Sequence, residues 1–246
     1  MGSNSRKKNQ MAIKKYLLGL SLLITVFIFL TLMVIGVILN EGRENYLDKK
    51  TQDIQNDFME MQIFDMMAET YSRDMACLAF KSKLKKLDHS VWELGDRIES
   101  YQAASEEFFK DPYYYEMKET YNENEVYYYL ILKNTIERCN LSKEVILFFY
   151  KNEEECRKCD DQSFILSDIN REDDDDGQQE IAIFTFDTDL NVTTVNLLSE
   201  YYSIVDYPCV VINETPYCGI RGEQFIMDRV CENSPELYIC GEYENS

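Results

Sequence analysis

The sequence predicts a mixed α/β domain preceded by one transmembrane helix and an α-helical stalk or bundle. Three observations lead to this fold class. Residues 16–39 form an uncharged apolar run, residues 41–139 carry apolar side chains at helical spacing, and short strand-like runs alternate with helical segments from residue 142 onward. We divide the chain into a basic tail (1–15), a transmembrane helix (16–39), an extracytoplasmic α-helical region (40–141) and an α/β domain with a cysteine-containing C-terminal tail (142–246).

The apolar run predicts a single-pass protein of the cell membrane. Its 24 uncharged residues would span roughly 36 Å as a helix, enough for the hydrocarbon core. Basic residues precede it at positions 6, 7, 8, 14 and 15 without any acidic residue. The positive-inside rule therefore places the N-terminus in the cytoplasm and residues 40–246 outside it. A cleaved signal peptide is the second interpretation, but the run is longer than a usual signal core and no small-x-small cleavage site follows.

Charge and cysteine usage narrow the function classes. The net charge of −20 excludes a typical nucleic-acid-binding protein, because phosphate binding needs a basic face. All eight cysteines lie beyond the apolar run, an even count that suits an oxidising compartment and disulfide bonds. The candidate structural cysteines are Cys77, Cys139, Cys209, Cys218, Cys231 and Cys240.

The helical region carries one apolar stripe, made of Leu47, Ile54, Phe58, Met61, Phe64, Ala68, Tyr71, Met75 and Leu78. We expect a second helix to be capped by Asp88 or Ser90 and a third to open at Asp111-Pro112 and end near Asn140. Cys77 and Cys139 would then lie on two helices that a disulfide could join. The stripe fits either packing within a short bundle or a dimerising coiled coil, so homo- or hetero-oligomers through this region stay open.

The α/β part begins at residue 142. The expected order is a strand at 145–150, a helix at 156–167, a strand at 181–186, a helix at 193–202, a strand at 209–212, a hairpin strand at 215–218 and a helix at 222–230. Asn213-Glu214 forms the turn of the hairpin. In that hairpin Cys209 and Cys218 could lie opposite each other and pair, and Cys231 and Cys240 could join the tail to the last helix. Eight cysteines allow 105 connectivities, so pairing itself is not derivable.

Cys156-Arg157-Lys158-Cys159 opens the first of these helices, and Tyr207-Pro208 leads into the third strand. A CxxC between a strand and a helix indicates a dithiol–disulfide motif. In this combination, residues 143–232 resemble the thioredoxin superfamily, in which a cis-proline faces a CxxC. The resemblance implies that Cys156 attacks and Cys159 resolves, that Pro208 is the cis-proline, and that the Tyr207 backbone pairs with bound peptide.

The resemblance further implies thiol–disulfide exchange with protein clients or a redox partner, without a cofactor or a metal. A helix N-terminus stabilises the thiolate of Cys156, and Arg157 and Lys158 add positive charge. The acidic residues around the motif oppose this, so we expect a less acidic thiol than in strongly oxidising members. The chain departs from the family pattern at Tyr150, where classical thioredoxins have a buried Asp, and at Cys209, which directly follows the proline.

Two alternatives remain beside the oxidoreductase. Cys156, Cys159, Cys209 and Cys218 could form a four-sulfur zinc site, although the second pair lacks the tight knuckle spacing. The domain could also be a redox-inactive binding or scaffold module of a membrane complex, with the CxxC as a structural disulfide.

Overall fold

A computed structural model of the chain describes residues 20–37, 73–104, 107–152, 155–174 and 179–243, with scattered positions between 56 and 70. It divides into two compact units, Met1–Asp53 and Ile54–Ser246. The second unit contains the sheet together with the helices that precede it. The basic tail expected at 1–15 lies outside the described residues, as do the first seven members of the expected apolar stripe.

The first unit contains one apolar helix, Leu20–Val37, which is long and apolar enough to cross a membrane. Its composition suits either a membrane anchor or a signal sequence near the N-terminus. The described residues thus contain an N-terminal apolar helix within the span predicted at 16–39.

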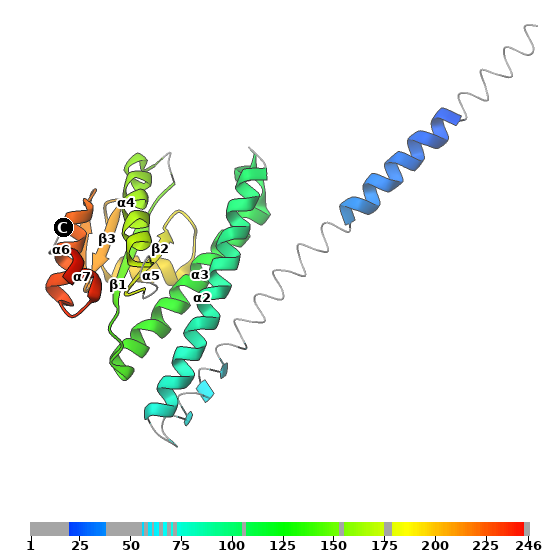
Figure 1. Cartoon of the computed structure of the whole chain (residues 1–246). Coiled ribbons are helices and arrows are strands. Elements are labelled where there is room, and N and C mark those ends of the chain that lie inside the picture. The colour runs from blue at the N-terminus through cyan, green and yellow to red at the C-terminus, as the bar shows by residue number, and fades with distance from the viewer. Residues whose placement is uncertain are drawn as a thin grey trace, which may run out of the picture. The chain divides into compact units, whose positions relative to one another are not determined.

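Two long helices precede the sheet (Figure 1): α2 (Arg73–Ala104) and α3 (Pro112–Cys139), joined through the short 3-10 helix η1 (Phe108–Lys110). The start of α3 is the one predicted, because Asp111 accepts the Tyr113 N–H at 3.0 Å and Pro112 occupies the first helical position. Asn140 ends α3 in the left-handed conformation, with φ 50°. A disulfide joins Cys77 of α2 to Cys139 of α3, as the sequence suggested.

Two expectations for α2 were wrong. No helix begins at Asp88 or Ser90, because α2 continues through both. Met75 and Leu78 are 45 % and 67 % exposed, and therefore do not belong to a buried stripe. The buried face of α2 is instead formed by Ala76, Phe80, Lys83, Leu84, Leu87, Leu94 and Ile98. It packs against α3, so the described part of α2 supports packing within a helical hairpin.

The sheet has four strands in the order β2-β1-β3-β4. They are β1 (Glu144–Tyr150), β2 (Ile181–Asp187), β3 (Cys209–Ile212) and β4 (Thr215–Cys218). β1 is parallel to β2 and antiparallel to β3, and β3 is antiparallel to β4. Asn213 and Glu214 turn the hairpin with φ 47° and 61°, the paired positive values that a two-residue primed turn requires. All four predicted strands are present.

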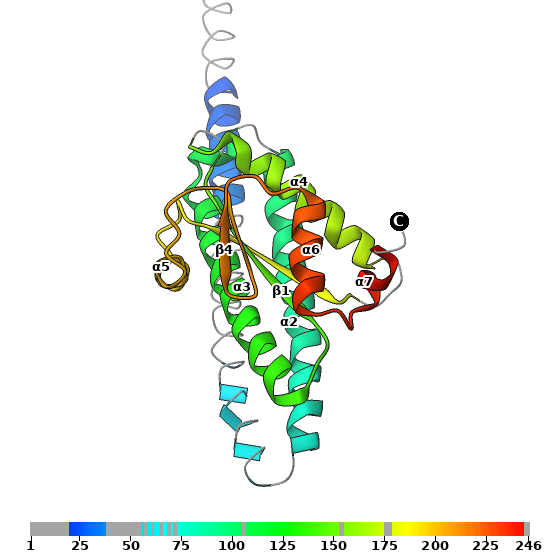
Figure 2. The same cartoon turned by 90° about the vertical axis from the view of Figure 1, so that its left-hand side faces the viewer.

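Helices cover both faces of the sheet. After β1 come α4 (Arg157–Asp174), α5 (Thr193–Tyr201), α6 (Glu223–Asn233) and α7 (Tyr238–Tyr243), of which α7 was not predicted. In Figure 1 the sheet lies between α6 and α7 on one side and α3 and α2 on the other. Figure 2 shows α5 and α6 on opposite sides of the β3–β4 hairpin. The α/β region is therefore a three-layer unit in which α3 forms part of one layer.

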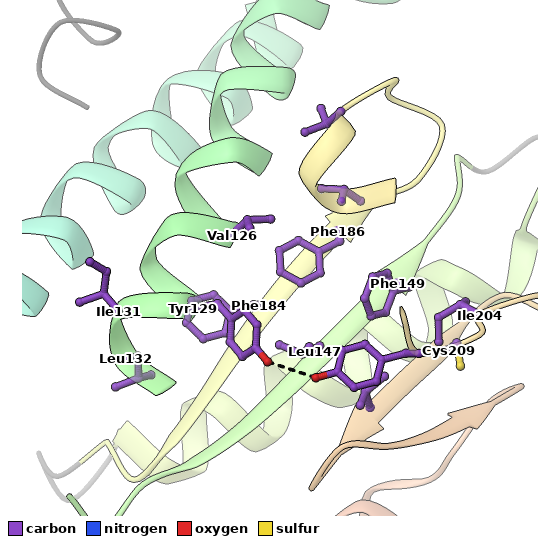
Figure 3. Close-up of a cluster of buried hydrophobic side chains, with 14 of the residues drawn as sticks. Val126, Tyr129, Ile131, Leu132, Leu147, Phe149, Phe184, Phe186, Ile204 and Cys209 are labelled. Carbon is purple, nitrogen blue, oxygen red and sulfur yellow. Dashed lines mark hydrogen bonds between the residues drawn. The ribbon is translucent and has the colours of Figure 1, made fainter. Parts of the chain in front are cut away.

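Each layer has its own hydrophobic core. The first core, between the sheet and α3 and α5 (Figure 3), includes Val126, Tyr129, Leu147, Phe149, Phe184, Phe186, Val195 and Ile204. The second, between the sheet and α4, α6 and α7, includes Ile146, Phe148, Ile169, Val210, Ile226 and Leu237. Neighbouring residues of β1 alternate between the two cores, as the two-residue period of a strand dictates.

Both edges of the sheet are protected. At the β2 edge, two buried side chains of α3 accept backbone N–H groups: Glu125 Oε2 accepts from Thr185 at 3.1 Å and Asn122 Oδ1 accepts from Asp187 at 2.9 Å. At the β4 edge, Pro216 has no N–H, and Arg221 Nη2 donates to the Cys218 carbonyl at 2.8 Å. These features satisfy or remove backbone groups that would otherwise pair with another chain.

Candidate functional site

The CxxC lies where a short connection from β1 enters α4. The backbone carbonyl of Asn152 accepts the Cys156 N–H at 2.8 Å. The Asn152 N–H in turn donates to Asp189 Oδ2 at 2.7 Å, and Asp189 follows β2. The two parallel strands therefore fix the connection from both sides, and they place Cys156 directly before the first residue of α4.

Cys156 and Cys159 form a disulfide across the first turn of α4, with their Cα atoms 5.4 Å apart. Cys156 is 6 % exposed and Cys159 is 2 % exposed, whereas Arg157 and Lys158 between them are exposed. Cys156 is therefore the more accessible of the two. Both sulfurs belong to the second core, between the sheet and α4, α6 and α7.

The segment before β3 borders both cores, including the one that contains this disulfide. The Tyr207-Pro208 peptide bond is cis and Pro208 is buried. Tyr207 is half-buried and packs against the cluster that contains Cys156 and Cys159. The CxxC and the cis-proline segment therefore border the same core, with Tyr207 as the contacting side chain of that segment.

Lys151 was missed by the sequence analysis. Its ammonium group pairs with the Glu155 carboxylate, lies 3.4 Å from Asp189 Oδ1, and sits 5.6 Å from the centre of the Tyr207 ring. The hydrogen bond to Glu155 raises the pKa of Lys151. Lys151 therefore connects the CxxC loop to the segment that carries Pro208. Its position directly after a strand and before a CxxC was the available signal.

Cys209 lies away from this cluster, although it directly follows Pro208. Its side chain is buried in the first core, on the face of the sheet that packs against α3 and α5. It forms a disulfide with Cys218, directly opposite on β4. A fourth disulfide joins Cys231 of α6 to Cys240 of α7. These are the pairs that the sequence suggested.

The zinc alternative is not supported by these pairings. Such a site requires four thiolates around one ion, but the structure joins the four sulfurs in two disulfides. The Cys156–Cys159 disulfide belongs to the second core, whereas the Cys209–Cys218 disulfide lies at the first. Among the described residues, no group of three or more His, Cys, Asp or Glu side chains could hold a metal ion.

A buried charged cluster lies beside the end of β1. Lys118 of α3 forms an ion pair with Asp187 at the end of β2, and its ammonium lies 5.6 Å from the centre of the Tyr150 ring. Burial opposes the charged ammonium, but the ion pair and hydrogen bond with the Asp187 carboxylate help to raise the pKa of Lys118. Burial also raises the pKa of Tyr150. Tyr150 is therefore a neutral phenol beside a Lys–Asp ion pair.

A second buried acid lies on the same side of the sheet. Glu125 accepts hydrogen bonds from the Tyr121 hydroxyl and the Thr185 hydroxyl, both at 3.1 Å, in addition to the Thr185 N–H. Burial raises the pKa of Glu125 to about 8 despite these bonds. The side chain is therefore mostly protonated at neutral pH, and it serves the contact between α3 and β2.

Comparison of the chain with protein-family models, with curated proteins and with solved structures found no match.

Proposed function

We propose that the chain is a membrane-anchored thiol–disulfide oxidoreductase whose thioredoxin-like domain acts on protein thiols and disulfides outside the cytoplasm. The observation that carries the proposal is the Cys156–Cys159 disulfide at the start of α4, with Tyr207 packed against the core that contains both sulfurs. The strand order and directions support the resemblance on which the roles of these residues rest. The apolar helix Leu20–Val37 supports the anchor, and the four disulfides suit an oxidising compartment.

The exchange proceeds in two steps. In the oxidising direction, a client thiolate attacks Cys156 Sγ, the Cys156–Cys159 bond breaks, and Cys159 leaves as a thiolate that takes up a proton. The second client thiolate then attacks the client sulfur of the mixed disulfide, and Cys156 leaves. The client gains one disulfide and the protein holds two thiols. Reduction of a client is the reverse sequence, and no bound cofactor takes part.

A redox-inactive binding module is the second candidate. One observation favours it: both sulfurs are almost buried, as in a permanent structural disulfide. In this case Cys156–Cys159 would hold the start of α4 in place, and the helical hairpin would serve as a contact surface within a membrane complex.

The reduction potential distinguishes the two candidates. The full-length chain in detergent is equilibrated in glutathione and dithiothreitol buffers, and mass spectrometry identifies which cysteines change state. A reversible Cys156–Cys159 couple above about −230 mV indicates an oxidase or isomerase, and one near about −270 mV indicates a reductant. We expect the other three disulfides to stay intact. A Cys156–Cys159 bond that resists reduction below about −300 mV contradicts the proposal and supports the binding module.

A further inference from the structure

Gln162 is a polar exception in the buried stripe of α4. The buried positions after the CxxC recur at helical spacing: Cys159, Gln162, Leu166 and Ile169. Gln162 is 0 % exposed. A buried amide is unfavourable unless both its donor and its acceptor are bonded, so an apolar side chain would be the ordinary choice for packing alone.

Both ends of the Gln162 amide bind the backbone of one residue, Arg221. The Arg221 N–H donates to Gln162 Oε1 at 2.7 Å, and Gln162 Nε2 donates to the Arg221 carbonyl at 3.1 Å. Arg221 lies in the segment between β4 and α6. The side chain therefore fixes this segment to the helix that carries the dithiol, one turn beyond Cys159.

The same segment is bonded to the cis-proline. The Gly219 N–H donates to the Pro208 carbonyl at 2.8 Å. The Arg221 guanidinium donates to the Cys218 carbonyl at 2.8 Å, and Cys218 is joined to Cys209, the residue after Pro208. A continuous set of bonds thus runs from α4 through Gln162 and Arg221 to Pro208.

We infer that Gln162 is a positioning residue, which sets the Tyr207-Pro208 segment relative to the Cys156–Cys159 dithiol so that a peptide client can bind beside it. This inference rests on the proposed function. A buried polar side chain with both ends satisfied specifies one arrangement of its neighbours more sharply than an apolar contact does. Gln162 serves client binding and not the reactivity of the sulfurs, because both of its hydrogen bonds go to the Arg221 backbone.

The test compares two reactions of the full-length chain in detergent. The first is steady-state reduction of a synthetic fluorogenic peptide disulfide with dithiothreitol as the electron donor that regenerates the Cys156/Cys159 dithiol, a reaction that needs the Tyr207-Pro208 segment. The second is direct reduction of Cys156–Cys159 by dithiothreitol, which needs only access to Cys156. Gln162→Met keeps the volume but removes both hydrogen bonds. Gln179→Met is the matched control, because Gln179 is exposed and its amide donates to the Asn170 side chain at 3.0 Å, away from Arg221.

For Gln162→Met we expect KM for the peptide disulfide to rise roughly tenfold, the effect of losing two hydrogen bonds. We expect kcat and the dithiothreitol rate to stay within about twofold of wild type, since a raised KM alone reports lost binding. Gln179→Met should behave as wild type. A parallel fall of both rates would indicate a merely structural role and overturn the inference, as would an unchanged KM.

A second variant covers the case in which Gln162→Met does not fold. Gln162→Leu also removes both hydrogen bonds, with a side chain of the kind that fills the neighbouring buried position Leu166, so its KM should rise as for Gln162→Met. A wild-type KM for this variant would contradict the inference. A wild-type chain that exchanges with neither reagent would instead overturn the proposed function, so the two failures are distinguishable.

Discussion

Glu125→Gln should stabilise the protein at neutral pH and remove part of its pH dependence. The burial that raises the Glu125 pKa to about 8 gives the folded state a higher proton affinity than the unfolded state, in which the group titrates near its ordinary value of 4.5. Glutamine has nearly the same shape and can still accept from Thr185 and donate toward Tyr121. It carries no proton to lose.

The sign and size follow from linkage. A raised folded pKa means that stability is greatest below pH 4.5 and falls as the pH rises toward 8, then levels off. One pKa unit corresponds to about 1.4 kcal/mol, so the roughly 2.5 pH units between the unfolded pKa and pH 7 lower the free energy of unfolding by about 3 kcal/mol. Because Glu125 is buried, we expect Glu125→Gln to recover most of this difference at pH 7 and little of it at pH 4.5.

The assay is urea unfolding of the full-length chain in detergent, followed by near-ultraviolet circular dichroism at several pH values between 4.5 and 8.5. The difference between wild type and Glu125→Gln isolates the contribution of this one carboxyl. Glu116→Gln, an exposed position on the same helix, is the control and should leave the pH profile unchanged. A variant that is less stable than wild type at pH 7, or that keeps the wild-type pH slope, would refute the reasoning.

Two further sets of variants test contacts of α3, one with β2 and one with α2. Lys118→Met leaves the Asp187 carboxylate buried without its ion-pair partner and should lower the free energy of unfolding by about 3–5 kcal/mol. The double variant Lys118→Met with Asp187→Asn should recover much of this loss. Chemical unfolding measures both, and equal effects of the single and double variants would contradict the pairing. Cys77→Ser with Cys139→Ser opens a loop of 62 residues, which should lower the free energy of unfolding by about 4 kcal/mol by the chain-entropy estimate. Non-reducing unfolding curves measure it, and an unchanged midpoint would show that the bond does not restrain the unfolded chain.

Local patterns predicted most of the α/β elements. Apolar runs of strand length located β1 and β2, and the Asn213-Glu214 pair located the hairpin because few other sequences tolerate two positive φ values in a row. Asp111-Pro112 located the start of α3 because an acceptor side chain before a proline satisfies the first turn. These signals depend on neighbours in sequence and need no knowledge of the tertiary structure.

Which face of α2 is buried was not predictable in the same way. Met75 and Leu78 have the right spacing for a buried stripe, but the buried residues of α2 include Lys83, whose ammonium is paired with Glu60 at 2.7 Å. Periodicity alone cannot choose between two adjacent faces when one contains a paired charge. Similarly, α7 is only six residues long, too short to show a helical period.

The sequence by itself determined the apolar N-terminal helix, the strands and the turn, the CxxC at a helix start and the proline before β3. Each of these features depends on residues that are adjacent in the sequence. Only the tertiary structure decided that Lys118 meets Asp187, that Glu125 covers the β2 edge, and that Gln162 binds the Arg221 backbone. These contacts join residues 59 to 69 positions apart, and each is polar and at least partly buried. Such contacts leave no periodic signal, because their stability depends on partners that only the folded chain brings within hydrogen-bond distance.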